Sequence, residues 1–76
     1  MHELPDAVLA ELLKQLREER EITQEELAFE AGITASALSR IERGINNPGW
    51  MTVRRIAEAL DVTLVQLARK IEDAGG

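Results

Sequence analysis

The sequence predicts an all-α protein, a compact bundle of five short helices. Apolar residues recur at helical spacing in several segments of its 76 residues. Threonines that can cap helix starts stand at Thr23, Thr34 and Thr63, and glycines that can end helices stand at Gly32 and Gly44. We expect a single domain, residues 1–76, whose core spans about residues 7–72.

The first helix is expected to begin at Pro5 and to end near Arg20. Its apolar stripe is wide for the first helix of a small bundle and consists of Val8, Leu9, Leu12, Leu13 and Leu16. Val8 and Leu12, with Leu4 before them, cover either the C-terminal helix or a partner subunit. We favour packing within the chain.

Two short helices joined by a tight turn follow. Thr23 and Glu26 have the spacing of a capping box, and Gly32 can adopt the left-handed conformation that ends a helix. Thr34 can cap the next helix, which runs from about Ala35 to Arg43. The residues expected to face inward are Leu27, Ala28, Ala31, Ala37, Leu38 and Ile41. A helix, a glycine-containing turn and a second helix form a helix-turn-helix motif.

The outward face of the third helix is small, polar and cationic. With Leu38 and Ile41 inward, the residues on the opposite side, at about 100° per residue, are Ser36, Ser39, Arg40 and Arg43. Short hydroxyls and arginines can enter a major groove and bond phosphates or base edges. The alternative interpretation is that this face is an ordinary solvent-exposed helix surface. The helix caps, the glycine-containing turn and the spacing of the two helices favour DNA binding.

The net charge of −5 is unevenly distributed along the chain. Residues 1–32 carry −6, residues 33–55 carry +3 and residues 56–76 carry −2. The positive segment contains the exposed face of the third helix and the loop after it, which supports DNA binding despite the acidic total.

Several kinds of protein are excluded by composition. The chain has no cysteine and one histidine, His2, so we expect no metal site and no cofactor. A nucleophile paired with a base is missing, so an enzyme is not expected. There is neither a signal peptide nor an apolar stretch of ~20 residues that could span a membrane. We expect a cytoplasmic protein that binds no membrane and no small-molecule ligand.

The last two helices follow the loop at residues 45–49. The fourth is expected over about Met51 to Leu60, and the fifth begins at a second capping box, Thr63 with Gln66. Their inward-facing residues are expected to be Met51, Val53, Ile56, Ala57, Leu60, Leu64, Leu67, Ala68 and Ile71. Trp50 covers the edge of the core or forms a dimer contact, and residues 73–76 are expected to fray.

The sequence resembles the Cro and lambda-repressor-like helix-turn-helix family, also called the XRE family. The matching segments cover roughly residues 9–68 and are Leu16–Arg20, Ile22–Ala28, Ala31–Ile33, Leu38–Gly44, Asn47–Pro48 and Ile56–Leu60. The resemblance implies a lambda-repressor-like fold, double-stranded DNA as partner, and a homodimer formed through the region between the fourth and fifth helices. Where the family usually has glycine after the first helix, this chain has Glu21, for which a left-handed conformation costs on the order of 1 kcal/mol.

The resemblance also implies which residues contact DNA. Those nearest the bases are Ala35, Ser36, Ser39 and Arg40, and Arg40 is the best candidate to bond guanine. Phosphate contacts are expected from Thr23, Gln24 and Thr34, because helix starts attract anions, and from Arg43, Asn46 and Asn47 after the third helix. A solvent-exposed glutamine at a helix start is the alternative for Gln24. A phosphate contact is the alternative for Arg40, and turn formation is the alternative for Asn46 and Asn47. Arg17 and Glu42 are expected to form a partly buried structural salt bridge.

We interpret the chain as a transcription regulator, more typical of a repressor than of an activator, that binds a palindromic operator as a homodimer. Ile45 and Asn46 stand where members of the family often have lysine or arginine, which removes charge facing phosphate. The alternative is a protein-interaction module on the same fold, antitoxin-like or an adaptor, with weak DNA affinity. The negative net charge of the whole chain favours the protein-interaction module, and the arginines of residues 33–55 favour DNA binding.

Overall fold

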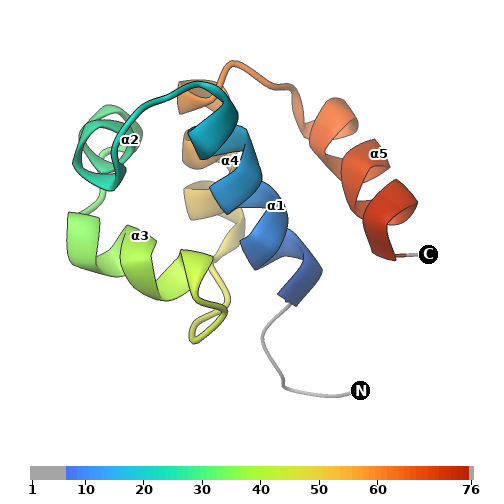
Figure 1. Ribbon diagram of the computed structural model, residues 1–76, viewed down its shortest axis with the longest axis horizontal. Coiled ribbons are helices and arrows are strands. Elements are labelled where there is room, and N and C mark those ends of the chain that lie inside the picture. The colour runs from blue at the N-terminus through green and yellow to red at the C-terminus, as the bar shows by residue number, and fades with distance from the viewer. Residues whose placement is uncertain (1–6, 76) are drawn as a thin grey trace.

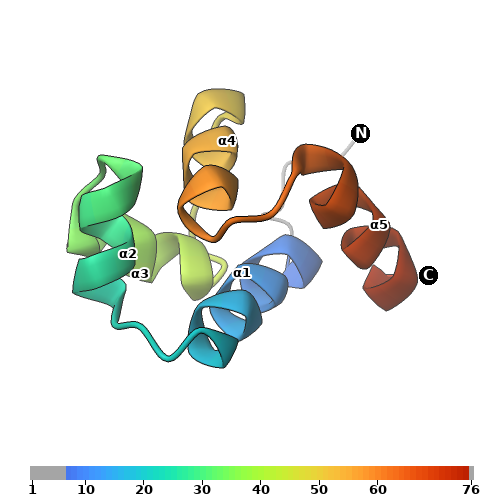
Figure 2. The same ribbon diagram turned by 90° about the horizontal axis from the view of Figure 1, so that it is seen from above.

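The computed structural model describes residues 7–75, which form five α-helices and no strand, as the sequence predicts. The helices are α1 (Ala7–Glu19), α2 (Gln24–Ala31), α3 (Ala35–Glu42), α4 (Trp50–Ala59) and α5 (Leu64–Gly75). Figures 1 and 2 show α2 and α3 at one end of the molecule and α5 at the other, with α1 and α4 between them. The predictions that concern Leu4 and Pro5 lie outside the described residues.

All five helices contribute to one hydrophobic core. Its buried members are Leu12, Leu13, Leu16, Leu27, Ala28, Ala31, Leu38, Ile41, Ile56, Ala57, Leu60 and Leu67. Val8 is half-buried and Leu12 is buried within the chain, in the helix that packs against α5. The intramolecular interpretation of the wide stripe of α1 is therefore correct for Leu12.

Three predictions about inward-facing residues are wrong. Met51 is exposed, because α4 meets the core only from Val53 onward, beyond its first turn. Ala68 is exposed, because α5 touches the core through the narrower stripe that includes Leu67. Ala37 is half-buried, not fully inward. The inward faces of α3, α4 and α5 are thus narrower than their apolar patterns suggest.

The C-terminal helix is longer than predicted. Instead of fraying from residue 73, α5 continues to Gly75. Asp73 and Ala74 line a surface hollow together with Leu12 and Gln15 of α1, so the last described turn of α5 lies opposite α1.

The connections after α1, α2 and α4 are built alike. Each has a residue in the left-handed conformation, then a β-branched apolar residue, then a threonine that caps the next helix. The left-handed residues are Glu21 (φ 58°), Gly32 (φ 75°) and Asp61 (φ 62°). The N–H group of the following residue bonds a carbonyl of the last helical turn, as in Ile22 to Arg17, Ile33 to Ala28 and Val62 to Ala57. Two of these three left-handed positions lack the glycine that normally relieves strain there.

Replacing Glu21 with glycine is therefore expected to stabilise the protein. The left-handed conformation costs glutamate roughly 1–2 kcal/mol, whereas glycine adopts it without strain. This gain is larger than the extra entropy that a flexible glycine loses on folding, so we expect the free energy of unfolding to rise by about 0.5–1 kcal/mol. Urea unfolding followed by circular dichroism measures it. Glu11→Gly is the matched control: it removes the same charge from an exposed position inside α1, where glycine is expected to destabilise by about 0.5–1 kcal/mol. Destabilisation by both substitutions would contradict the prediction.

Candidate nucleic-acid interface

Helix α3 buries one face and exposes a polar one. Leu38 and Ile41 lie in the core, whereas Ser36 and Arg40 are exposed and Ser39 is half-buried. Within residues 7–75, no hydrogen bond or ion pair engages the Arg40 guanidinium. Its five N–H donors can therefore bond an acceptor outside the chain.

Ala35 is the least accessible of the residues predicted to lie near bases. It is half-buried and packs against the core at the start of α3. A methyl group in this position can offer at most an apolar contact, for example to a thymine methyl group.

The starts of α2 and α3 are both capped by threonine, as predicted. Thr23 Oγ1 accepts the N–H of Glu26 at 3.0 Å, and Glu26 Oε1 accepts the N–H of Thr23 at 2.8 Å. Thr34 Oγ1 accepts the N–H of Ala37 at 3.0 Å. Both hydroxyls act as acceptors in these bonds, so each still has a hydrogen to donate. Uncapped N–H groups at the same helix starts favour a bound anion.

A buried polar cluster surrounds Glu42, the last residue of α3. Glu42 Oε2 lies 2.8 Å from Arg17 Nε, and Glu42 Oε1 accepts Arg17 Nη2 and Gln24 Nε2, both at 3.0 Å. Arg17 Nη1 also donates to the carbonyl of Ile22 at 2.9 Å. The side chains of Arg17 and Glu42 are only 12% and 2% exposed. The cluster therefore joins α1, the start of α2 and the end of α3.

Arg17 keeps its charge in this cluster over the neutral range of pH. The hydrogen bond to Glu42 raises the pKa of Arg17 above its ordinary value, against the opposing effect of burial. A raised pKa contributes stability that is fully present below the ordinary arginine pKa and is lost as pH rises through the raised value. Arg17 therefore stays charged at every pH at which the protein would normally be studied.

The segment after α3 places further polar groups on the surface. Arg43 is exposed, and its Nε donates to the carbonyl of Ser39 at 3.4 Å, so the side chain folds back along the helix. Asn46 and Asn47 are also exposed, in the loop that leads to α4. These three residues are predicted phosphate contacts and are accessible to a ligand approaching this end of α3.

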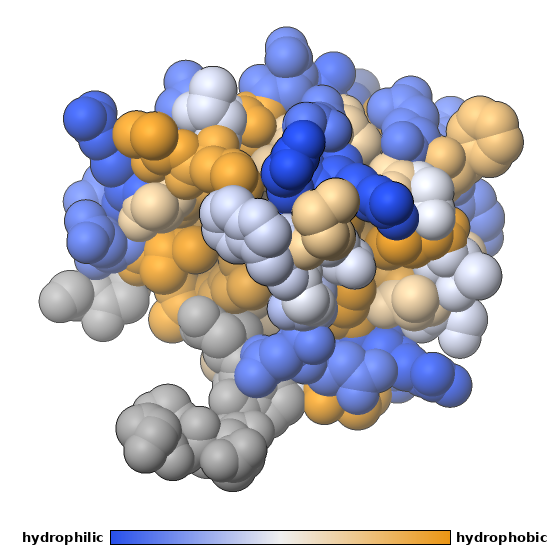
Figure 3. Space-filling view, turned by 180° about the vertical axis from the view of Figure 1, so that it is seen from behind, coloured by the Kyte–Doolittle hydropathy of each residue, from blue (hydrophilic) through white to orange (hydrophobic). Residues whose placement is uncertain are grey.

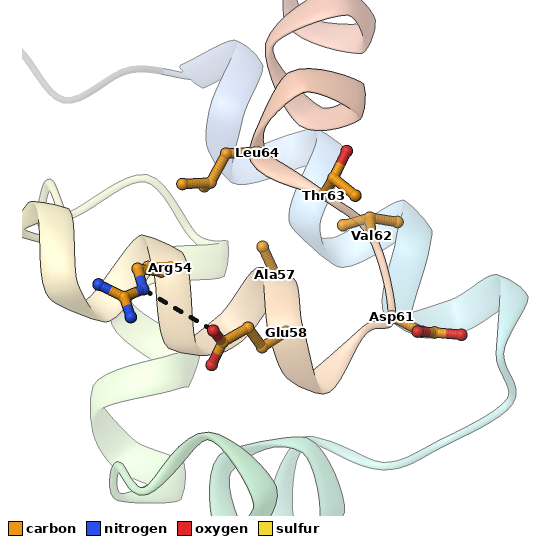
Figure 4. Close-up of a pocket in the computed structure, with 7 residues that line it drawn as sticks. All are labelled: Arg54, Ala57, Glu58, Asp61, Val62, Thr63 and Leu64. Carbon is orange, nitrogen blue, oxygen red and sulfur yellow. Dashed lines mark ion pairs between the residues drawn. The ribbon is translucent and has the colours of Figure 1, made fainter.

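A groove of about 370 Å³ lies between α4 and α5 (Figure 4). It is lined by Arg54, Ala57, Glu58, Asp61, Val62, Thr63 and Leu64. Arg54 Nε lies 3.7 Å from Glu58 Oε2, and both side chains are exposed. Arg54 therefore belongs to this groove, although the sequence groups it with the arginines near α3.

Large apolar side chains are exposed on the same two helices. Trp50 at the start of α4 is 65% exposed, and Val65 in the first turn of α5 is 63% exposed. Trp50 does not cover the core edge, which was one of its two predicted roles. In Figure 3 apolar side chains gather on the left, where α5 lies in that view, with hydrophilic side chains beside them.

Two contacts near the predicted site were not foreseen from the sequence. One is the hydrogen bond from Gln24 to Glu42, which no helical spacing signals because it joins separate helices. The other runs from Arg20 Nη1 to the carbonyl of Leu60 at 2.9 Å and joins the connection after α1 to the end of α4.

The fold and the exposed face of α3 define the class of protein: an all-α helix-turn-helix domain whose motif consists of α2 and α3. In the described part of the chain, no helix is long and apolar enough to cross a membrane. The same residues contain no group of three or more His, Cys, Asp or Glu side chains that could hold a metal ion.

The chain belongs to the helix-turn-helix family of the XRE type. The family model described as "Helix-turn-helix" matches residues 13–71. The transcriptional regulator y4dL of Sinorhizobium fredii is 35% identical over 66 residues, which cover 87% of this chain and 34% of y4dL. The transcriptional repressor RghR of Bacillus subtilis is 44% identical over 55 residues, which cover 68% of this chain and 39% of RghR. The chain thus spans well under half the length of these two relatives.

A solved structure with the same fold contains DNA. It is a mutant of the restriction-modification controller protein C.Esp1396I bound to its highest affinity operator site OM. The TM-score is 0.85 at 25% sequence identity, and the match covers 90% of each chain.

Proposed function

We propose that this protein is a cytoplasmic transcription regulator that binds a palindromic operator in double-stranded DNA as a homodimer, and that it acts as a repressor. The observations that carry the proposal are the exposed polar face of α3, with an unpaired Arg40 guanidinium, and the threonine-capped starts of α2 and α3. The operator complex of C.Esp1396I and the description of RghR as a repressor support it. No catalytic step forms part of the proposal.

In the proposed complex, α3 enters the major groove. The residues proposed to lie nearest the bases are Ala35, Ser36, Ser39 and Arg40, and those proposed to bond phosphates are Thr23, Gln24, Thr34, Arg43, Asn46 and Asn47. Arg40 can bond two acceptors of one guanine at once. Few of the other side chains can read a base edge, so we propose that DNA shape contributes to specificity.

The surface proposed to bind the second copy is the groove between α4 and α5 together with the exposed side chains of Trp50 and Val65 on the same two helices. Burying a side chain such as Val65 stabilises an interface by up to ~1.5–3 kcal/mol, and Trp50 offers a larger area nearby. The groove carries Arg54 together with Glu58 and Asp61, so it is charged with both signs. A two-fold axis can then place the arginine of each copy opposite the carboxylates of the other.

Selection of bound duplexes from a random pool, at about 0.1 M salt, tests the proposal. We expect recovery of a palindrome whose half-sites lie ~10 base pairs apart, because two recognition helices of a dimer enter successive major grooves. Val65→Glu is the matched variant: Val65 is exposed, so the substitution should leave the fold intact and abolish the dimer in sedimentation. Palindromic binding should then fall, and an undiminished dimer would contradict the proposed interface.

A protein-interaction module is the second candidate function. The outer face of α2 favours it: Phe29 is 87% exposed there, beside the exposed acids Glu25, Glu26 and Glu30. Such a face repels phosphate and fits a basic protein surface with an apolar pocket. A folded, dimeric protein that enriches no duplex from the pool would support this candidate over DNA binding.

A further inference from the structure

The buried carboxylate of Glu42 does more than pair with Arg17. Its Oε1 accepts a hydrogen bond from Gln24 Nε2 at 3.0 Å, in addition to the bond from Arg17 Nη2. A carboxylate can only accept hydrogen bonds, so the amide of Gln24 must turn its nitrogen, and not its oxygen, toward Glu42. The orientation of this amide is therefore determined by chemistry.

We propose that Glu42 is a positioning residue for DNA binding, which fixes the side-chain amide of Gln24 so that its second N–H is held ready for a DNA phosphate. This inference rests on the proposed function. An amide group is planar, so fixing one N–H bond restricts the other to directions at a fixed angle from it. A glutamine side chain that is ordered before binding loses little conformational entropy when the phosphate arrives.

The location of Gln24 suits this role. Gln24 is the first residue of α2, directly after the cap Thr23, at a helix start where unpaired N–H groups attract anions. Gln24 is half-buried, so a ligand in solution can reach it while the buried Glu42 holds its amide.

The acceptor is itself held firmly. Glu42 is 2% exposed and receives two hydrogen bonds from Arg17, which is anchored in turn to the carbonyl of Ile22. The direction of the Gln24 amide thus depends on a cluster built on three helices.

A double-mutant cycle separates positioning from a purely structural role. Gln24→Ala is made in the wild-type chain and in a chain with Arg17→Met and Glu42→Met, because replacing a buried pair with apolar residues commonly preserves folding. DNA affinity is measured for all four proteins, with folding checked by circular dichroism. In the wild type, Gln24→Ala should weaken binding about three- to tenfold, as expected for loss of one hydrogen bond. In the Met–Met background the loss should shrink to less than about twofold.

The outcomes are distinct. An equal loss in both backgrounds would overturn the positioning role while leaving DNA binding in place. A wild-type protein that binds no duplex would overturn the proposed function, and this inference with it.

A second measurement does not depend on the variants folding. In the 1H–15N spectrum of the wild type, one side-chain N–H of Gln24 should exchange slowly with water, and the other should shift when operator DNA is added. The exposed Gln15 in α1 serves as the control in the same spectrum. Exchange of both Gln24 protons as fast as those of Gln15 would overturn the proposal.

Discussion

Replacing Glu42 with alanine is expected to lower the free energy of unfolding by about 3–5 kcal/mol, which is the largest effect expected from any single substitution here. The side chain of Glu42 is 2% exposed and neutralises Arg17, which is 12% exposed. Its removal leaves a desolvated guanidinium without its partner and an amide at Gln24 without its acceptor. A chain of 76 residues has a total stability of roughly 4–11 kcal/mol, so much of it would be lost.

Urea unfolding at low temperature measures this effect. Glu30→Ala is the matched control, since Glu30 is an exposed acid on α2 and its removal should change stability by no more than about 0.5 kcal/mol. The exposed pair of Arg54 with Glu58, at 3.7 Å, should also contribute little. A loss below about 1 kcal/mol for Glu42→Ala would mean that water reaches Arg17 more easily than its burial indicates.

Replacing Arg40 with alanine is expected to relax DNA preference at one base position of each half-site. A bidentate contact to guanine contributes ~1–3 kcal/mol of discrimination, which corresponds to a factor of roughly 5–150 between guanine and the other bases. Arg40 is exposed and unpaired within the described residues, so its guanidinium is free to make that contact. Its loss should leave the fold unchanged, because the side chain packs against nothing in the core.

Affinity for a set of operators that differ at single positions measures the effect. Arg43→Ala is the matched control, because Arg43 is proposed to bond a phosphate and its loss should weaken binding to all sequences equally. If Arg40→Ala also lowers the affinity for all operators by the same factor, Arg40 contacts a phosphate and the assignment to a base is wrong.

The starts of α2, α3 and α5 and the end of α2 were predictable because local chemistry sets them. Thr23 with Glu26 and Thr63 with Gln66 form reciprocal capping boxes, as their spacing indicates. Gly32 ends α2 in the left-handed conformation. Each of these interactions spans only a few residues, so a short window of sequence contains all of it.

The faces of the last helices were less predictable because neighbouring elements decide them. The exposed Met51 and Ala68 belong to the apolar patterns of their helices and yet lie outside the core. Periodicity gives the centre of an apolar stripe, whereas its width depends on how many helices pack against it. The same limit applied to Gln24: its place at a helix start was predictable, but its bond to the distant Glu42 was not.

The buried cluster also bears on the order in which the chain folds and unfolds. Arg17 and Glu42 are separated by 25 residues, and Gln24 and Glu42 by 18, so the cluster closes only when α1, α2 and α3 have docked. We expect so non-local a cluster to form after the folding transition state, and such an interaction slows unfolding while it leaves the folding rate almost unchanged. We therefore expect the ion pair to act mainly on the lifetime of the folded protein.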